Sequence, residues 1–116
     1  MTAADLKPLT TAELEALSAE LKQALMALYG SRFDRLILYG SYARGDFHAE
    51  SDVDFLLVLQ DEKVRFGKEI WFMGDVVGKL SDAYGLFISV KPVSVAAFAS
   101  TTTLFYQTVR KQGKPV

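Results

Sequence analysis

The sequence predicts an α/β fold of the α+β type: a small mixed β-sheet with helices packed on one face. Two long stretches, residues 10–29 and 63–84, repeat apolar side chains every three or four residues, which is typical of amphipathic helices. Three short apolar runs, at residues 32–39, 52–59 and 86–90, are typical of strands. Because helices alternate with strands along the chain, we expect a layered fold in which helices cover the sheet.

The composition fits one domain over residues 1–116, with room for a proper core but not for a second domain. A net charge of −1 argues against a nucleic-acid groove, and no apolar run approaches the ~20 residues of a membrane helix. The absence of cysteine excludes a disulfide framework and a thiolate zinc site. Because the chain has no signal pattern at its start, we expect a cytoplasmic protein without membrane or nucleic-acid partners; a homo-oligomer stays open.

The first helix is predicted to begin with a capping box, in which Thr10 and Glu13 satisfy each other's backbone N–H groups. Gly30-Ser31 ends this helix. The strand at 32–39 is apolar on both sides, which favours a central position in the sheet. The apolar face of the helix is interpreted as a packing surface and comprises Leu14, Leu17, Leu21, Leu25 and Leu28.

The second long helix, at 63–84, carries Gly67, Gly74 and Gly78 along one line of its surface. Each glycine costs a helix about 0.8–1 kcal/mol relative to alanine. Either the helix is broken near Gly74, or this line permits close approach of another backbone. The neighbouring backbone would be an intramolecular helix or a partner chain, and we favour the intramolecular helix.

The last part of the chain is predicted to contain a third strand, two short helices and a tail. Lys91-Pro92 ends the strand at 86–90 or makes it an edge strand, because proline cannot donate to a hydrogen-bond ladder. Ser94 is expected to cap the helix that follows. The remaining predicted elements are a helix at 95–99, a helix at 103–111 and a tail at 113–116.

Two aspartates open the strand at 52–59. Asp52 and Asp54 are two residues apart, so both carboxylates point to the same side of an extended strand. Such a pair is repulsive unless a cation lies between the two charges, and hard oxygen ligands suit Mg²⁺. Asp52 and Asp54 are therefore the candidate metal ligands.

The turn that precedes these aspartates supplies groups that a metal-bound triphosphate requires. Gly40 lets backbone N–H groups approach a phosphate closely, and Ser41 adds a hydroxyl and an N–H at the start of a short helix. Arg44 can reach a phosphate oxygen with its planar guanidinium. Gly40, Ser41 and Arg44 are the candidate nucleotide-binding residues. The nearby polar residues interpreted as surface groups are Asp46, His48 and Glu50.

The turn Gly40-Ser41 is followed by ten residues and then by Asp52-x-Asp54. This pattern resembles the signature of the nucleotidyltransferase superfamily that includes DNA polymerase beta and kanamycin nucleotidyltransferase. The wording Gly-Ser-Tyr-Ala-Arg-Gly at 40–45 is most similar to the minimal nucleotidyltransferase (MNT) domains. The resemblance implies a polymerase-beta-like palm in which Asp52 and Asp54 are catalytic and bind metal. It also implies Mg²⁺ as the cofactor and ATP, or another nucleoside triphosphate, as the substrate.

Short MNT proteins resemble antitoxins that adenylylate a tyrosine of a separately encoded, all-helical HEPN ribonuclease. The resemblance therefore implies transfer of a nucleoside monophosphate, AMP from ATP, to a hydroxyl of a partner protein. A HEPN-type toxin is the implied partner.

Active members of this superfamily resemble one another in carrying a third acidic residue, on the strand next to the aspartate pair. In this chain the corresponding residues, 86–91, contain neither Asp nor Glu, and Ser89 or Lys91 is expected near its place. Without the third carboxylate a second metal ion loses a ligand, and the attacking hydroxyl loses a base that is typically worth about 10²–10⁴-fold. Two functions stay open: a slow or partner-assisted enzyme, and a catalytically weak or inactive protein that neutralises or regulates a partner by binding.

Overall fold

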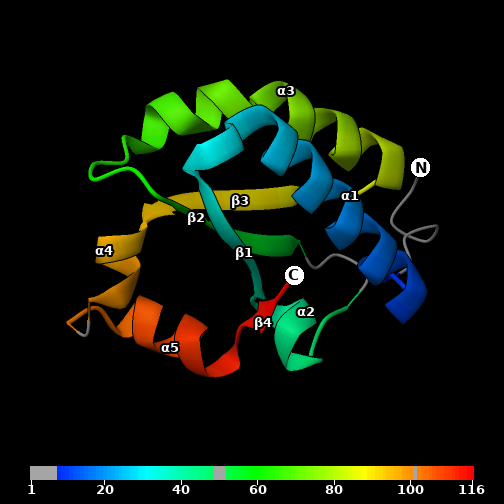
Figure 1. Ribbon diagram of the computed structural model, residues 1–116. Helices are drawn as coiled ribbons and strands as arrows, with labels where there is room; N and C mark the ends of the chain where they lie inside the picture. Colours follow the sequence, from blue (N-terminus) through cyan, green and yellow to red (C-terminus); the bar gives the residue numbers. More distant parts are fainter. Residues whose placement is uncertain (1–7, 49–51, 101) are drawn as a thin grey trace.

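The computed structural model describes residues 8–48, 52–100 and 102–116, and it shows a curved sheet between layers of helices (Figure 1). The elements in chain order are α1 (Thr11–Tyr29), the 3-10 turn η2 (Gly30–Arg32), β1 (Phe33–Tyr39), α2 (Ser41–Arg44), β2 (Val53–Leu59), α3 (Phe66–Tyr84), β3 (Ile88–Ser94), α4 (Val95–Ala99), α5 (Leu104–Gln112) and β4 (Lys114–Pro115).

The four strands form one mixed sheet in the order β3-β2-β1-β4. Strand β1 is antiparallel to both of its neighbours, whereas β2 and β3 are parallel and are connected through α3. The mixed sheet and the central position of β1 are therefore confirmed. Of the two alternatives for Lys91-Pro92, the edge strand is confirmed, whereas a strand end there is wrong because β3 continues to Ser94. The tail forms a short strand that the sequence did not predict: β4 pairs with β1, and the Val116 N–H donates to the Leu36 carbonyl at 2.9 Å.

Helices cover both faces of the sheet. The long helices α1 and α3 lie on one face, over a core that includes Phe55 and Leu57. The shorter helices α4 and α5 lie against the other face, over Leu56 and Val58. The fold class is confirmed. We expected helices on one face of the sheet only, whereas α4 and α5 cover the second face as well. The reason is that β2 is apolar at successive residues, so both of its sides require cover.

Helix α3 is continuous through Gly74, and its glycines do not contact another part of the described chain. A Cβ atom placed at Gly67, Gly74 or Gly78 would have no atom within 4 Å. The preferred intramolecular explanation for these glycines is therefore wrong. The helix packs onto the core through another line of side chains, which consists of Met73, Val77, Leu80 and Tyr84.

A cluster of charged and polar side chains joins α1, η2 and α3 to the loop after β2, at one end of the β1–β2 pair. Arg32 donates from Nε to Asp61 at 2.9 Å and from Nη2 to Glu69 at 2.6 Å. The Tyr29 hydroxyl donates to the other oxygen of Glu69 at 3.2 Å. Burial and the neighbouring Glu69 carboxylate raise the pKa of Tyr29, so its hydroxyl remains a donor. We refer to Tyr29, Arg32, Asp61 and Glu69 as the Arg32 cluster.

The first helix begins as predicted. The Glu13 N–H donates to Thr10 Oγ1 at 3.1 Å, and the Thr10 N–H donates to Glu13 Oε1 at 2.9 Å, which completes the capping box. Within the described residues, no helix combines the length and the apolar character that crossing a membrane requires.

Candidate active site

The turn between β1 and α2 lies directly against one of the two aspartates. Gly40 has φ +78° and ψ −158°, a conformation that glycine adopts readily and other residues do not. A Cβ atom at this position would lie 2.5 Å from Asp54 Oδ2. The structure thus brings the predicted phosphate-binding turn and the predicted metal ligand into contact, and glycine is required for both backbone conformation and space.

Helix α2 is short, and aromatic side chains hold it in place. The N–H groups of Ala43 and Arg44 both donate to the Gly40 carbonyl at 3.1 Å. Tyr42 is buried, its hydroxyl accepts from the Leu9 N–H at 3.0 Å, and its ring stacks on Phe47 with centroids 4.3 Å apart. These contacts fix the position of the adjacent Ser41. The sequence prediction did not assign this anchoring role to Tyr42, although a large aromatic residue inside a polar turn was a signal for it.

The two aspartates form no ion pair with the residues that the structure describes. Asp54 is the second residue of β2 and is partly buried, whereas Asp52 precedes the strand and is exposed. Within residues 8–48, 52–100 and 102–116, neither carboxylate accepts a hydrogen bond or forms an ion pair. Burial is the main cause that raises the pKa of Asp54, the nearby Asp52 carboxylate raises it further, and Arg44 opposes this shift. The pair is therefore a local excess of negative charge that a bound cation would relieve.

The other polar residues of the turn lie at the surface. Arg44 is exposed and donates from Nε to Asp46 at 3.2 Å, so this arginine is not committed to a buried structural pair. Its influence on the pKa of Asp54 indicates that the guanidinium lies near the carboxylates. His48 is exposed, in agreement with its interpretation as a surface group, and Glu50 lies outside the described residues.

Strand register shows which residue of β3 lies beside Asp54. Asp54 pairs with Tyr39 of β1 on one side and with Ser89 of β3 on the other. Residues paired in this way share a face of the sheet, so Tyr39, Asp54 and Ser89 form a row across three strands. Lys91 pairs with Leu56 instead. The alternative left by the sequence is therefore resolved: Ser89 stands beside Asp54, and Lys91 lies one step further along the same face.

Tyr39 belongs to the site although sequence reasoning did not select it. Burial and the neighbouring Asp54 raise its pKa to about 12, so its hydroxyl stays protonated near neutral pH. Its ring packs edge-on against Phe105 of α5, with centroids 5.3 Å apart. Lys91 Nζ lies 4.3 Å from the centroid of the same Phe105 ring. Tyrosine directly before the Gly-Ser turn was the available signal, because an antiparallel pair places this residue opposite Asp54.

A comparison with protein families agrees with this geometry. The model of the nucleotidyltransferase domain family matches residues 14–87, a range that contains the turn, both aspartates and the whole of α3. This chain belongs to the nucleotidyltransferase domain family.

Two relatives of this nucleotidyltransferase are proteins of Methanocaldococcus jannaschii. The chain is 35% identical over 96 residues to MJ0604, named a protein adenylyltransferase, and the alignment covers 82% of this chain and 89% of that protein. It is 41% identical over 49 residues to MJ0141, which carries the same name; that match covers 42% of this chain and 50% of the relative.

Solved structures show the same fold. A chain from a toxin-antitoxin complex with AMP-PNP matches with a TM-score of 0.57 and 22% identity, over 82% of this chain and 68% of that chain. A chain from a mutant of the toxin-antitoxin complex MntA-HpeT matches with a TM-score of 0.54 and 21% identity, over 94% of this chain and 72% of that chain. The mixed sheet of the nucleotidyltransferase is therefore shared with proteins of toxin-antitoxin assemblies.

Proposed function

We propose that this nucleotidyltransferase is a cytoplasmic, Mg²⁺-dependent adenylyltransferase that transfers AMP from ATP to a hydroxyl of a partner protein. A HEPN-type toxin is the proposed partner, and the chain acts as a single minimal domain whose acceptor is supplied by this second protein. The observation that carries the proposal is the contact of the Gly40 turn with Asp54, a carboxylate that forms no ion pair with a described residue. The relatives named as protein adenylyltransferases and the neighbours from toxin-antitoxin complexes support the choice of substrate and partner.

The donor set fits one magnesium ion. Asp52 and Asp54 supply carboxylate oxygens, which suit a cation that keeps several waters and takes phosphate oxygens as further ligands. Within the described residues, no cluster of three or more Asp, Glu, His or Cys side chains could enclose a metal. When bound, the ion would neutralise charge on the triphosphate. We therefore propose Asp52 and Asp54 as the ligands of one nucleotide-bound ion and propose no protein site for a second ion.

The turn residues are proposed to hold the triphosphate. Gly40 leaves space for a phosphate beside the backbone, Ser41 contributes its hydroxyl and N–H, and Arg44 is exposed and available to a phosphate oxygen. Transfer forms a bond between the acceptor oxygen and the α-phosphorus and breaks the bond to the leaving pyrophosphate. The product is an AMP ester of the acceptor.

Among the described residues, we assign no base to the proton of the acceptor hydroxyl. Ser89 replaces a carboxylate beside Asp54, and Tyr39 remains protonated at neutral pH because its pKa is about 12. We propose that this proton passes to water or to a group of the partner. The expected consequence is slow transfer, because a positioned base typically contributes about 10²–10⁴-fold.

The second candidate function is regulation of a partner by contact alone. Ser89 beside Asp54 favours it, because the residue cannot serve as a carboxylate ligand or base. The two functions differ in their need for the aspartates, since a contact surface elsewhere on the fold does not require them.

Transfer of label from α-labelled ATP tests the proposal. The reaction contains Mg²⁺ and a purified protein encoded beside this gene, with the Asp52→Asn/Asp54→Asn variant as control. We expect label on the neighbouring protein with the wild type and none with the variant. The contact function would be supported instead if the wild type does not label the neighbouring protein, while the double variant still binds this protein and neutralises its activity.

A further inference from the structure

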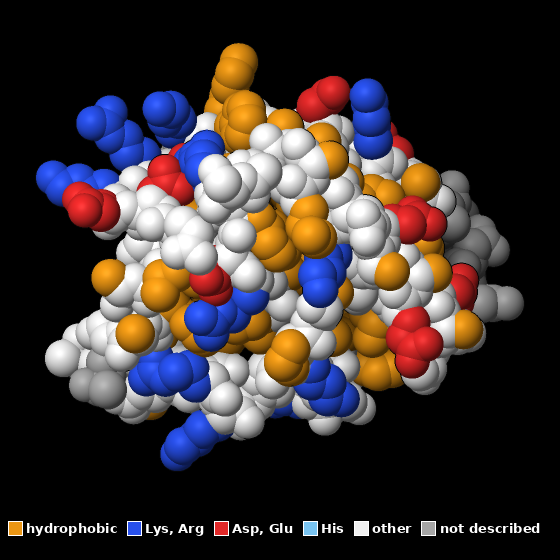
Figure 2. Space-filling view, viewed as in Figure 1, with side chains coloured by type: hydrophobic (Ala, Val, Ile, Leu, Met, Phe, Trp, Pro, Cys, Tyr) orange, Lys and Arg blue, Asp and Glu red, His pale blue; other side chains and the backbone are white. Residues whose placement is uncertain are grey.

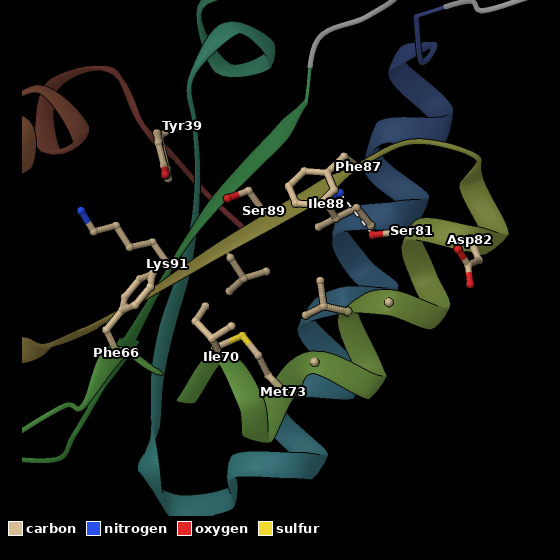
Figure 3. A pocket seen from close by; sticks show the side chains of 14 residues that line it. Tyr39, Phe66, Ile70, Met73, Ser81, Asp82, Phe87, Ile88, Ser89 and Lys91 are labelled. Atoms are coloured by element: carbon tan, nitrogen blue, oxygen red, sulfur yellow. Dashed lines mark hydrogen bonds between the residues drawn. The ribbon is translucent and has the colours of Figure 1, made fainter. Parts of the chain in front are cut away.

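A groove of about 760 Å³ runs between α3 and the edge strand β3 (Figure 3). Its α3 side is mainly apolar, and across the edge of β3 it extends to Tyr39, Ser89 and Lys91 on the opposite face of the sheet. Phe66 and Phe87, which both line the groove, are 56% and 64% exposed. Hydrophobic side chains are also visible at the surface over α3 in the space-filling view (Figure 2). The groove therefore joins an exposed apolar surface to the row of residues that contains Asp54.

The chemistry of transfer decides from which side the acceptor approaches. In phosphoryl transfer the attacking and leaving oxygens lie roughly in line on opposite sides of the phosphorus. The Gly40 turn, which is proposed to hold the leaving pyrophosphate, lies on the β1 side of Asp54. The attacking hydroxyl must therefore come from the β3 side, where Ser89 lies beside Asp54 and the groove begins.

We propose that this groove is the acceptor site and that it binds an apolar segment of the partner protein that carries the attacking hydroxyl. The inference rests on the proposed adenylyltransferase function and adds the place and chemistry of acceptor recognition. A small polar acceptor would require several convergent polar groups. The charged lining residues, Lys91 and Asp82, instead lie at opposite ends of the groove, with apolar side chains between them (Figure 3).

Side-chain packing, and not strand addition, is the expected mode of binding. The Ile88 N–H of the edge strand already donates to Ser81 Oγ at 3.2 Å, and Pro92 has no N–H. The edge of β3 therefore offers few backbone donors for a further strand. Apolar side chains of the partner segment would contact Phe66, Ile70 and Phe87 along the groove.

Two of the α3 glycines keep the groove open. Gly74 and Gly78 line it, and a Cβ atom at either position would have no atom within 4 Å. A Cβ atom can therefore be added at either position without a clash, and leucine favours a helix relative to glycine. Gly67 lies in equally open space on the same helix but does not line the groove, so it provides a matched control.

The test compares Gly74→Leu/Gly78→Leu with Gly67→Leu. Each variant is assayed for transfer of label from α-labelled ATP to the protein encoded beside this gene, for binding of Mg-AMP-PNP, and for thermal stability. We expect the double leucine variant to lose at least about tenfold in transfer through a raised KM for the acceptor protein. Binding of Mg-AMP-PNP and the melting temperature should not fall, and Gly67→Leu should behave as wild type.

Transfer at wild-type rate and KM by the double leucine variant would overturn the acceptor site while leaving the adenylyltransferase function intact. The wild type could instead self-associate, with the two leucines dissociating the oligomer and leaving transfer unchanged. That result would assign the groove to a second copy of the chain and would also overturn the inference. Absence of transfer by the wild type would instead contradict the proposed function on which the inference rests.

Discussion

The two ends of the β1–β2 pair differ in whether their carboxylates form ion pairs. At one end, Asp61 and the 3%-exposed Glu69 are both paired with Arg32. At the other end, Asp52 and Asp54 have no hydrogen bond or ion pair with any residue that the structure describes. The same two strands thus connect carboxylates that share an arginine with carboxylates that form no ion pair within the described residues.

This difference separates a structural role from a functional role. A buried carboxylate is tolerated when it is paired and hydrogen-bonded, as in the Arg32 cluster. An unpaired, partly buried carboxylate lowers stability, and such groups concentrate at functional sites. We therefore interpret the Arg32 cluster as part of the scaffold and the aspartate pair as part of the nucleotide site.

Equivalent substitutions at the two ends should have different effects on activity. Asp54→Asn removes a proposed metal ligand and is expected to reduce AMP transfer by at least about 100-fold, because changes next to metal ligands alone cost about 10–100-fold. Asp61→Asn, the matched control in the Arg32 cluster, should retain transfer within a few-fold. The measurement is the initial rate of label transfer at saturating ATP. Equal losses in both variants would remove the functional distinction.

Arg32→Ala should be the most destabilising of these changes. It leaves the buried Glu69 with the Tyr29 hydroxyl as its remaining partner from the cluster, and loss of such a partner is expected to cost about 2–4 kcal/mol. Urea unfolding of the metal-free protein measures the effect. Arg44→Ala, at an exposed ion pair near the aspartates, is the control and should change the free energy of unfolding by less than about 0.5 kcal/mol.

Gly40→Ala should affect both stability and the site. The positive φ and the contact with Asp54 Oδ2 predict a loss of about 1–3 kcal/mol in the free energy of unfolding. A displaced Asp54 should also weaken Mg-AMP-PNP binding. Gly45→Ala has a similar positive φ of 83° but open space around the new Cβ, so it controls for backbone strain alone. If Gly40→Ala and Gly45→Ala bind Mg-AMP-PNP with equal affinity, the close contact between Gly40 and Asp54 is not required for nucleotide binding.

Asp54→Asn should stabilise the metal-free protein at neutral pH, because it removes a charge that burial and Asp52 disfavour. The expected gain is about 0.5–2 kcal/mol, as is common for single stabilising substitutions. The pKa of Asp54 is raised in the folded state, so its contribution to stability is fully present below its ordinary value and is lost as pH rises through the raised pKa. The advantage of Asn should therefore vanish in acid and grow toward neutral pH. Unfolding of both proteins across this range measures it, and an Asn variant that is less stable at pH 7 would contradict the shift.

The sequence predicted the parts of the molecule that depend on neighbours along the chain. The capping box of α1, the strand before Gly40 and the pairing of the turn with the aspartate strand follow from local patterns. The choice between Ser89 and Lys91 could not be made, because it depends on the register of a parallel pair separated by the whole of α3. The cover that α4 and α5 provide, and the outward position of Gly74, likewise depend on tertiary packing.

Calorimetric titration with Mg-AMP-PNP tests the central claim most directly, because it measures the site without an acceptor. We predict saturable binding of one nucleotide and one Mg²⁺ per chain, with no detectable binding to the Asp52→Asn/Asp54→Asn variant and unchanged affinity in Asp61→Asn. Binding that is equal in the wild type and the double variant, or that is lost in Asp61→Asn alone, would contradict the assignment of the uncompensated aspartates to the nucleotide site.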